Sequence, residues 1–350
     1  MKMSVGSIFS VFALLMILLS GCTSTSTSDV NEQVEDTKSN TVSISSDGSG
    51  DFATLDEAIE AAPPNSIIVL GEGQFDLSES HLIEKSLTIQ GAGSNLTTIS
   101  KSSGGSPIIL FKGEKLIVRG ISIKRAGEFA SDIMTINGGE ADFEDCNISG
   151  GATSEDKTIQ GVGLVIRGSS NVTMKNCIIE NNAGFGIVVT DNAKLTVDQI
   201  KSVNNQIGIV FAKNSIGDVQ NSIFSDNIDY GIFVIGLVQV NIEGNTIVKN
   251  GTGGIYFELE AANGEVRDNK LAENDLGDSG TDIKIMEVYS PALIGNTCDG
   301  KGKSRLGGDL NGIVFMGRKS TPTDPILEGN SCMVARCTTP TGSFLSLECK

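Results

Sequence analysis

Short apolar segments recur at a nearly constant interval through the middle of the chain. Each is a Gly followed by three apolar residues: GLVI at Gly163, GIVV at Gly186, GIVF at Gly208, GIFV at Gly231 and GIYF at Gly254. The intervals are 23, 22, 23 and 23 residues, and an Asn recurs in step with them at positions 182, 205, 227, 250 and 274. Two markers that keep phase over five units indicate a repeat architecture in which each unit is one supersecondary element.

The alternation of side chains inside each repeat predicts short strands. In GIVV, Ile187 and Val189 would point inward and Val188 outward, because residues two apart in a strand face the same side. The recurring Asn tolerates left-handed backbone geometry, and stacked Asn side chains could bond to one another at a coil spacing of about 4.8 Å. The unit is too short for a propeller blade and lacks the pattern of a leucine-rich repeat. We therefore predict an all-β fold, a single parallel β-helix solenoid of about ten coils.

A short helix is expected ahead of the repeats. Residues 54–57 read TLDE, a capping box, and Pro63-Pro64 would stop the helix near Ala62. Its apolar face makes it suited to cover the open N-terminal end of the solenoid.

The first residues have the pattern of an exported lipoprotein. Lys2 precedes an apolar segment, Ile8–Leu19, and LSGC ending at Cys22 follows. The segment is too short for a transmembrane helix, which needs about 20 residues. LSGC resembles the lipobox of prokaryotic lipoproteins, which implies cleavage before Cys22, lipidation of Cys22, and anchoring to a membrane on the exported side, at the cell surface or in the periplasm.

The sequence thus divides into four predicted parts. These are a signal peptide over residues 1–21, a flexible tether over 22–41, the β-helix over 42–330, and a Cys-containing tail over 331–350. The formal net charge of −17 argues against a nucleic acid partner.

Six cysteines follow Cys22: Cys146, Cys177, Cys298, Cys332, Cys337 and Cys349. An even number in an oxidising compartment permits three disulfides, but the sequence does not choose the pairing. Cys146 and Cys177 are expected on neighbouring coils, either as a disulfide or as a buried pair of thiols.

The GI-x-V strands and the Asn-bearing turns resemble the right-handed parallel β-helix, or pectin-lyase-like, superfamily over about residues 45–330. The segment DGSGDFATLDEAIEAAP is similar to the opening of pectin methylesterases, but the catalytic motifs of that family, QDTL and DFIFG, have no counterpart here. The single histidine, His81, is expected to be a solvated surface residue, which argues against a His-dependent catalytic triad. No catalytic residue is identified, and no cofactor is predicted apart from calcium as an option.

An outward column of apolar residues is the strongest candidate binding site. Counting two residues past each repeat Gly gives Val165 and then the candidate ligand-binding residues Val188, Val210, Phe233 and Tyr256. Such a strip would bind a sugar chain or a partner protein, unless a loop or the C-terminal segment covers it. Asp275, Asp278 and Asp282 offer oxygen ligands for calcium, or form an ordinary polar loop.

Three functions remain open at this point. The first is a lipid-anchored protein that binds polysaccharide or a cell-surface partner along its lateral face. The second is a polysaccharide lyase or another carbohydrate-active enzyme, and the third is an adhesin or an accessory maturation protein. The fold alone does not choose among them, because function depends on the site.

Overall fold

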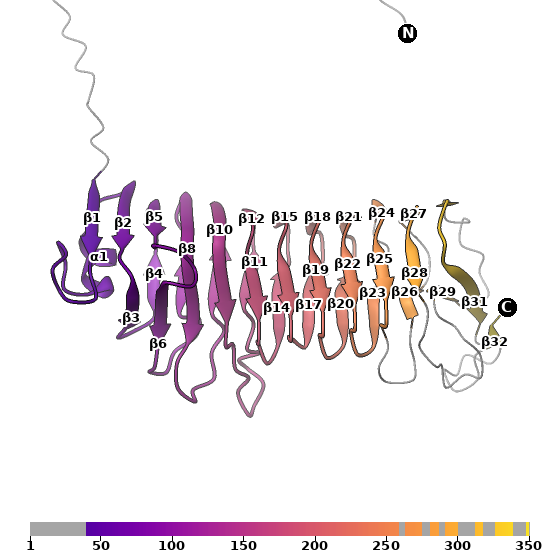
Figure 1. Cartoon of the computed structure of the whole chain (residues 1–350), viewed down its shortest axis with the longest axis horizontal. Coiled ribbons are helices and arrows are strands. Elements are labelled where there is room, and N and C mark those ends of the chain that lie inside the picture. The colour runs from indigo at the N-terminus through magenta and orange to yellow at the C-terminus, as the bar shows by residue number, and fades with distance from the viewer. Residues whose placement is uncertain are drawn as a thin grey trace, which may run out of the picture. The chain divides into compact units, whose positions relative to one another are not determined.

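The computed structural model describes residues 40–258, 263–274, 281–286, 291–299, 312–317, 326–338 and 348–349. Over this part the chain winds as a parallel β-helix whose coils stack side by side in chain order (Figure 1). None of the described helices is long and apolar enough to cross a membrane. The predicted signal peptide, Cys22 and nearly all of the predicted tether lie outside the described residues.

Each regular coil contributes one strand to a sheet of 12 strands, sheet B, and two strands to a sheet of 20, sheet A. The strands of sheet B are β4 (His81–Ile83), β7 (Ile109–Phe111), β9 (Met134–Asn137), β11 (Leu164–Arg167), β14 (Phe185–Val189), β17 (Ile207–Ala212), β20 (Tyr230–Ile235), β23 (Gly253–Glu258), β26 (Thr281–Met286), β29 (Gly312–Gly317), β31 (Met333–Thr338) and β32 (Glu348–Cys349). All neighbours pair in parallel except β31 and β32. Sheet B therefore continues beyond residue 330, into the segment predicted as a tail.

Sheet A consists of two rows of parallel strands joined by the long strands β8 and β10. The first row is β1 (Thr41–Ile44), β2 (Ser66–Leu70), β5 (Leu87–Gln90), β8 (Lys115–Arg125), β10 (Glu140–Ser149), β12 (Asn171–Lys175), β15 (Lys194–Asp198), β18 (Ile216–Gln220), β21 (Gln239–Glu243), β24 (Glu265–Arg267), β27 (Ala292–Ile294) and β30 (Leu327–Glu328). The second row includes the C-terminal halves of β8 and β10 and also β3 (Gly73–Leu77), β6 (Thr97–Lys101), β13 (Ile178–Glu180), β16 (Lys201–Val203), β19 (Ile223–Ser225), β22 (Thr246–Val248), β25 (Lys270–Ala272) and β28 (Thr297–Asp299).

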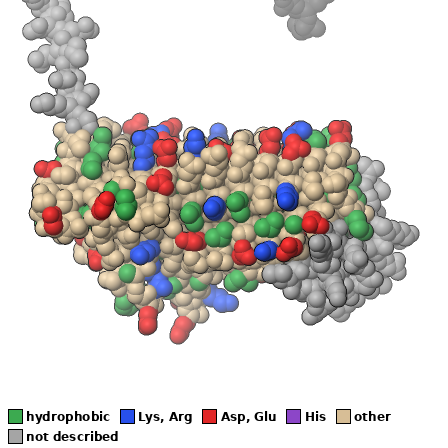
Figure 2. All heavy atoms as spheres, in the orientation of Figure 1, with side chains coloured by type: hydrophobic (Ala, Val, Ile, Leu, Met, Phe, Trp, Pro, Cys, Tyr) green, Lys and Arg blue, Asp and Glu red, His purple; other side chains and the backbone are tan. Residues whose placement is uncertain are grey.

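The core lies between the sheets and is built from in-register columns of aliphatic side chains. In sheet B, Ile187, Ile209, Ile232 and Ile255 occupy one column, and all are fully buried. Burial of each such side chain contributes about 1.5–3 kcal/mol relative to exposure. The predicted inward and outward alternation of GIVV is confirmed. Figure 2 shows one outer face, where acidic and basic side chains are interspersed and hydrophobic groups are small and separate.

The recurring Asn residues form a buried hydrogen-bonded ladder that runs from coil to coil. Asn182 Nδ2 donates to Asn205 Oδ1 at 2.9 Å, and Asn227 Nδ2 donates to Asn250 Oδ1 at the same distance. The expected bonding between stacked Asn side chains is therefore confirmed. The ladder Asn residues do not themselves adopt left-handed geometry, contrary to our expectation; the residue before each one does, such as Asn181 or Asn204.

A second Asn ladder, which we did not predict, follows the turn between the two rows of sheet A. Asn245, Asn269, Asn296 and Asn330 occupy it, and each of the first three donates its amide Nδ2 to the Oδ1 of the next at 2.9–3.0 Å. Because buried amides that lack partners are costly, both ladders fix the register of the coils.

Helix α1 (Leu55–Ala61) covers the N-terminal end of the solenoid, as predicted. Thr54 Oγ1 accepts the Glu57 N–H at 3.2 Å, and a Glu57 carboxylate oxygen accepts the Ala53 N–H at 3.2 Å. The Thr54 half of the capping box is therefore formed, and Glu57 reaches back one residue beyond the N-cap, to Ala53 instead of Thr54. Leu55, Ala58 and Ile59 are buried on the inner face of the helix.

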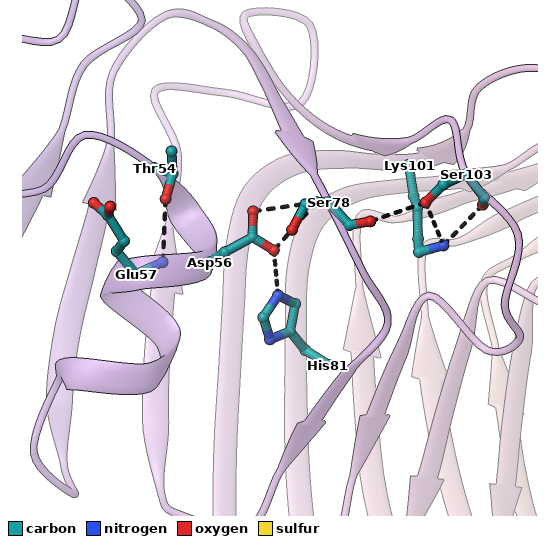
Figure 3. A network of polar contacts seen from close by, with 7 residues as sticks. All are labelled: Thr54, Asp56, Glu57, Ser78, His81, Lys101 and Ser103. Atoms are coloured by element: carbon teal, nitrogen blue, oxygen red, sulfur yellow. Dashed lines mark hydrogen bonds and ion pairs between the residues drawn. The ribbon is translucent and has the colours of Figure 1, made fainter.

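His81 is not a solvated surface residue, and that prediction was wrong. The side chain is 6% exposed, and its Nε2 lies 2.5 Å from Asp56 Oδ1 in α1 (Figure 3). The Ser78 N–H donates to both oxygens of the same carboxylate. Burial opposes ionisation of Asp56, but the bonds from His81 and Ser78 hold the pKa of this carboxyl below its usual value. The pair fastens α1 to β4.

A buried lysine continues this network into the next coil. Lys101 Nζ donates to the carbonyl and hydroxyl oxygens of Ser103 at 2.8 and 3.0 Å, and Ser103 Oγ donates to the Ser78 carbonyl at 2.9 Å (Figure 3). Burial lowers the pKa of Lys101, so these oxygens are needed to stabilise its charge.

The six cysteines that follow Cys22 fall into three groups. Cys298 and Cys332 form a disulfide between neighbouring coils, with a Cα–Cα distance of 4.8 Å. Cys146 and Cys177 are buried free thiols, so the structure shows the second of the two predicted alternatives. The backbones of Cys337 and Cys349 pair across β31 and β32, and their side chains lie outside the described part.

Candidate functional site

The outer face of sheet B carries the predicted apolar column. In register, the column runs Val165, Val188, Val210, Phe233, Tyr256 and Lys284. Val188 and Phe233 are half-buried, whereas Val210 and Tyr256 are each 7% exposed. The four candidate residues thus do share one face, but the column is less exposed to solvent than the sequence predicted. That they bind a ligand stays a prediction.

Three aromatic rings meet on this face, over β20 and β23. Tyr256 lies 5.0 Å from Tyr230 and 5.3 Å from Phe233 between ring centroids, and Tyr230 lies 5.9 Å from Phe233. These distances suit favourable offset or tilted aromatic pairs. We call Tyr230, Phe233, Tyr256 and the adjacent Lys284 the ring cluster.

A glycine makes room for one of the rings. A Cβ atom on Gly253 would lie 3.2 Å from Tyr230 Cε1 and 2.9 Å from the Thr281 carbonyl oxygen. Tyr230 precedes its repeat Gly, so it stands outside the outward column defined by sequence spacing. Its pairing in register with Gly253, one coil further on, is the signal that could have revealed it.

The polar groups around the rings are held in fixed positions. Lys284 Nζ lies 4.7 Å from the centre of the Tyr256 ring, a cation–π contact, and the Tyr256 hydroxyl donates to Met286 Sδ at 2.7 Å. Burial raises the pKa of Tyr230 to about 12 and also raises that of Tyr256, so both phenols stay protonated at neutral pH. Burial lowers the pKa of Lys284, and Glu258 opposes that shift. The ring cluster therefore offers apolar ring faces, phenol hydroxyls and an ammonium group together.

The predicted calcium ligands are only partly described. Asp275 and Asp278 lie outside the described residues. Asp282 is 3% exposed and accepts a hydrogen bond from Asn274 Nδ2 at 2.9 Å, so it ends the first Asn ladder. Burial raises the pKa of Asp282 to about 6. Among the residues that the structure describes, no three His, Cys, Asp or Glu side chains are grouped so that they could hold a metal ion.

A polar recess lies on the outer face of sheet A, over β18, β21 and β24. It has a volume of about 480 Å³ and is lined by polar side chains, including Asp218, Asn241 and Glu265. Arg267 Nη2 is paired with Glu265 at 2.6 Å, which leaves this recess without a free cation among the described residues. It contains none of the predicted site residues.

Comparison with known proteins identifies the family. Residues 65–216 and 207–336 match the profile of the family described as "Right handed beta helix region", so the chain belongs to this family. This confirms the predicted right-handed parallel β-helix. No curated protein sequence matches the chain significantly.

Several solved structures have the same fold at low sequence identity. The A-module of the mannuronan C-5 epimerase AlgE4 from Azotobacter vinelandii is 12% identical, with a TM-score of 0.55 over 81% of this chain and 89% of that one. The Dettilon tailspike protein gp208 is 14% identical, with a TM-score of 0.54 over 83% and 66%. The periplasmic alginate epimerase AlgG is 11% identical, with a TM-score of 0.50 over 83% of both chains. At these identities the similarity shows the fold alone.

Proposed function

We propose that this protein binds a polysaccharide along the outer face of sheet B, with the ring cluster as its main contact. The single observation that carries the proposal is the meeting of Tyr230, Phe233 and Tyr256 on the outer side of the solenoid, in a chain with only 5% aromatic residues in all. Two of the solved β-helix proteins are named for mannuronan and alginate, which supports the choice of a polysaccharide.

The geometry of the face suits an extended chain ligand. Val188 and Val210 continue the column from the rings toward the N-terminal coils at a coil spacing of about 4.8 Å. Ligand sites are commonly lined by aromatic and apolar side chains with a few placed polar groups that fix orientation. Here the hydroxyl of Tyr230 and the ammonium of Lys284 supply those polar groups, while the half-buried rings of Tyr230 and Phe233 supply the area that stacks on sugar rings.

The test compares binding by two double variants on a panel of soluble and immobilised polysaccharides. Tyr230→Ala with Phe233→Ala should lose at least ~10-fold in affinity, which corresponds to about 1.4 kcal/mol. The matched control, Ile178→Ala with Ile223→Ala, removes two half-buried side chains from the second row of sheet A and should bind normally. Thermal unfolding confirms that both variants are folded. Unchanged binding in the ring variant would exclude the proposal.

A second candidate function, a polysaccharide lyase, is favoured by one observation. Lys284 places an amine beside the rings, with its Nζ 4.7 Å from the centre of the Tyr256 ring, and burial lowers its pKa, which favours the neutral form that acts as a base. A lyase would release an unsaturated product that absorbs ultraviolet light, and Lys284→Met would abolish that signal. The assay is run with and without calcium. If the protein binds saccharide but releases no absorbing product, the lyase function is excluded and binding is the remaining candidate.

The proposed location is the exported side of a membrane, to which a lipid on Cys22 would anchor the chain. Cys22→Ser should release the protein from the membrane fraction and prevent incorporation of labelled fatty acid. Retention of Cys22→Ser in the membrane fraction would rule out this anchor.

A further inference from the structure

Cys146 and Cys177 lie on neighbouring coils, in the turn between the two rows of sheet A. The residues that follow them, Asn147 and Ile178, are partners in the parallel register of β10 and β13, so the two cysteines stand side by side. Each is 1% exposed. The hydrogen bond between the two thiols, together with burial, raises the pKa of Cys146, and the same bond lowers the pKa of Cys177. The parallel register thus places the two buried thiols side by side on neighbouring coils.

The same column of the solenoid holds the second Asn ladder. In later coils it is filled by Asn245, Asn269 and Asn296, whose amides bond from coil to coil. In place of such an amide, Cys146 Sγ donates to the Val118 carbonyl at 3.3 Å. Thiols are weak donors and weak acceptors, so the cysteine pair bridges its two coils far less firmly than an amide pair does. A covalent bond at this position would replace what the Asn ladder supplies elsewhere.

The chain already contains a disulfide with the same spatial relation. Thr297 and Ser331 are parallel partners on neighbouring coils, and the next residues, Cys298 and Cys332, are bonded at a Cα–Cα distance of 4.8 Å. Side-by-side positions on adjacent parallel coils are thus compatible with a disulfide in this solenoid. The distance also falls within the range that disulfides require.

We propose that Cys146 and Cys177 form a second disulfide between coils when the protein folds in an oxidising compartment. The thiolate of one cysteine attacks a disulfide of the oxidant, such as oxidised glutathione or a protein disulfide catalyst, and forms a mixed disulfide. The thiolate of the other cysteine then displaces the oxidant. Two protons leave the cysteines, and their two electrons reduce the oxidant's disulfide to two thiols. Because both sulfurs are buried in the finished coil, the exchange takes place before the coils close.

The test maps the cysteines of the full chain exported to an oxidising compartment. The protein is denatured in the presence of an alkylating agent, digested without reductant and analysed by mass spectrometry. We expect a peptide containing Cys146 linked to one containing Cys177, with the Cys298–Cys332 link as the internal positive control. Alkylation of both Cys146 and Cys177 while Cys298 and Cys332 are linked would overturn the proposal, and so would a link from either to Cys337 or Cys349.

A second measurement separates the covalent bond from packing. Wild type and Cys146→Ala with Cys177→Ala are unfolded in urea, each prepared once oxidised and once fully reduced. Reduction also breaks the Cys298–Cys332 disulfide, but it does so in both proteins, so its effect on stability cancels when the two are compared. The oxidised wild type should unfold at higher urea than the oxidised variant, and the gap should shrink in the reduced pair. If wild type and variant differ in urea midpoint by the same amount in the oxidised and the reduced preparations, the difference comes from packing and the proposed disulfide is refuted.

Discussion

Replacing Asp282 with Asn should stabilise the protein at neutral pH and have little effect near pH 4. The carboxyl of Asp282 is 3% exposed and is held by Asn274 Nδ2 at 2.9 Å at the end of the first Asn ladder. An Asn at this position keeps the accepting oxygen and carries no charge. Burial raises the pKa of Asp282 from 3.8 to about 6, which shows that the folded state disfavours the ionised form.

The size and sign of the effect follow from proton linkage. A pKa raised by about 2 units corresponds to about 3 kcal/mol between the protonated and ionised forms. Since the folded pKa lies above the unfolded value, the folded state binds the extra proton between about pH 4 and pH 6. The stability that this proton contributes is fully present below the unfolded pKa and is lost as pH rises through the folded pKa. Asp282→Asn should therefore gain up to about 3 kcal/mol over wild type above pH 6.

The assay is urea unfolding of wild type and Asp282→Asn at several pH values between about 4 and 8. Asp226→Asn is the control, because Asp226 is an exposed residue with positive φ, a conformation that Asn tolerates equally well. A difference between wild type and Asp282→Asn that did not change with pH would refute the reasoning. Repeating the series with calcium tests the predicted metal site, since a calcium ligand at Asp282 would make calcium stabilise wild type and not the variant.

Three further predictions address the ladder, the cap and the ring cluster. Asn227→Ala should lower the unfolding free energy by about 3 kcal/mol or more, because it leaves several buried hydrogen-bonding groups unpaired; an unchanged urea midpoint would contradict this. Asp56→Asn should destabilise the N-terminal coil above about pH 4, where the wild-type carboxylate is ionised and bound to His81, and this difference should shrink as pH falls through the lowered folded pKa; hydrogen exchange of α1 measures it. Gly253→Ala should displace the Tyr230 ring and weaken saccharide binding several-fold while the remaining coils stay folded, and normal binding would show that the position of Tyr230 is unimportant.

The coil architecture could be predicted because each repeat carries its own local signal. The Gly and the ladder Asn recur at fixed positions, and period-2 alternation separates Ile187 from Val188 without knowledge of neighbouring coils. The helix start at Thr54 is also a local signal, and Thr54 caps the Glu57 N–H as expected. These features need only sequence spacing and standard strand or helix geometry.

The features that were missed all depend on the register between distant segments. His81, in β4, bonds to Asp56, 25 residues earlier, and a single His gives no periodic signal. Tyr230 joins the rings only because the coil after it places Gly253 against its ring. The spacings within the second Asn ladder, from Asn245 to Asn330, widen from coil to coil. Irregular spacing hid that ladder, since the loops between its members vary in length.

The central claim, that a polysaccharide binds at the ring cluster, is tested most directly by tyrosine fluorescence. The chain has no Trp and three Tyr, of which Tyr230 and Tyr256 lie in the cluster, so Tyr289→Phe leaves a signal that comes from the site alone. We predict a saturable change on titration with soluble polysaccharide fragments, and its loss in Phe233→Ala, which keeps both fluorescent rings. An unchanged titration curve in Phe233→Ala, or no polysaccharide that changes the signal, would contradict the account.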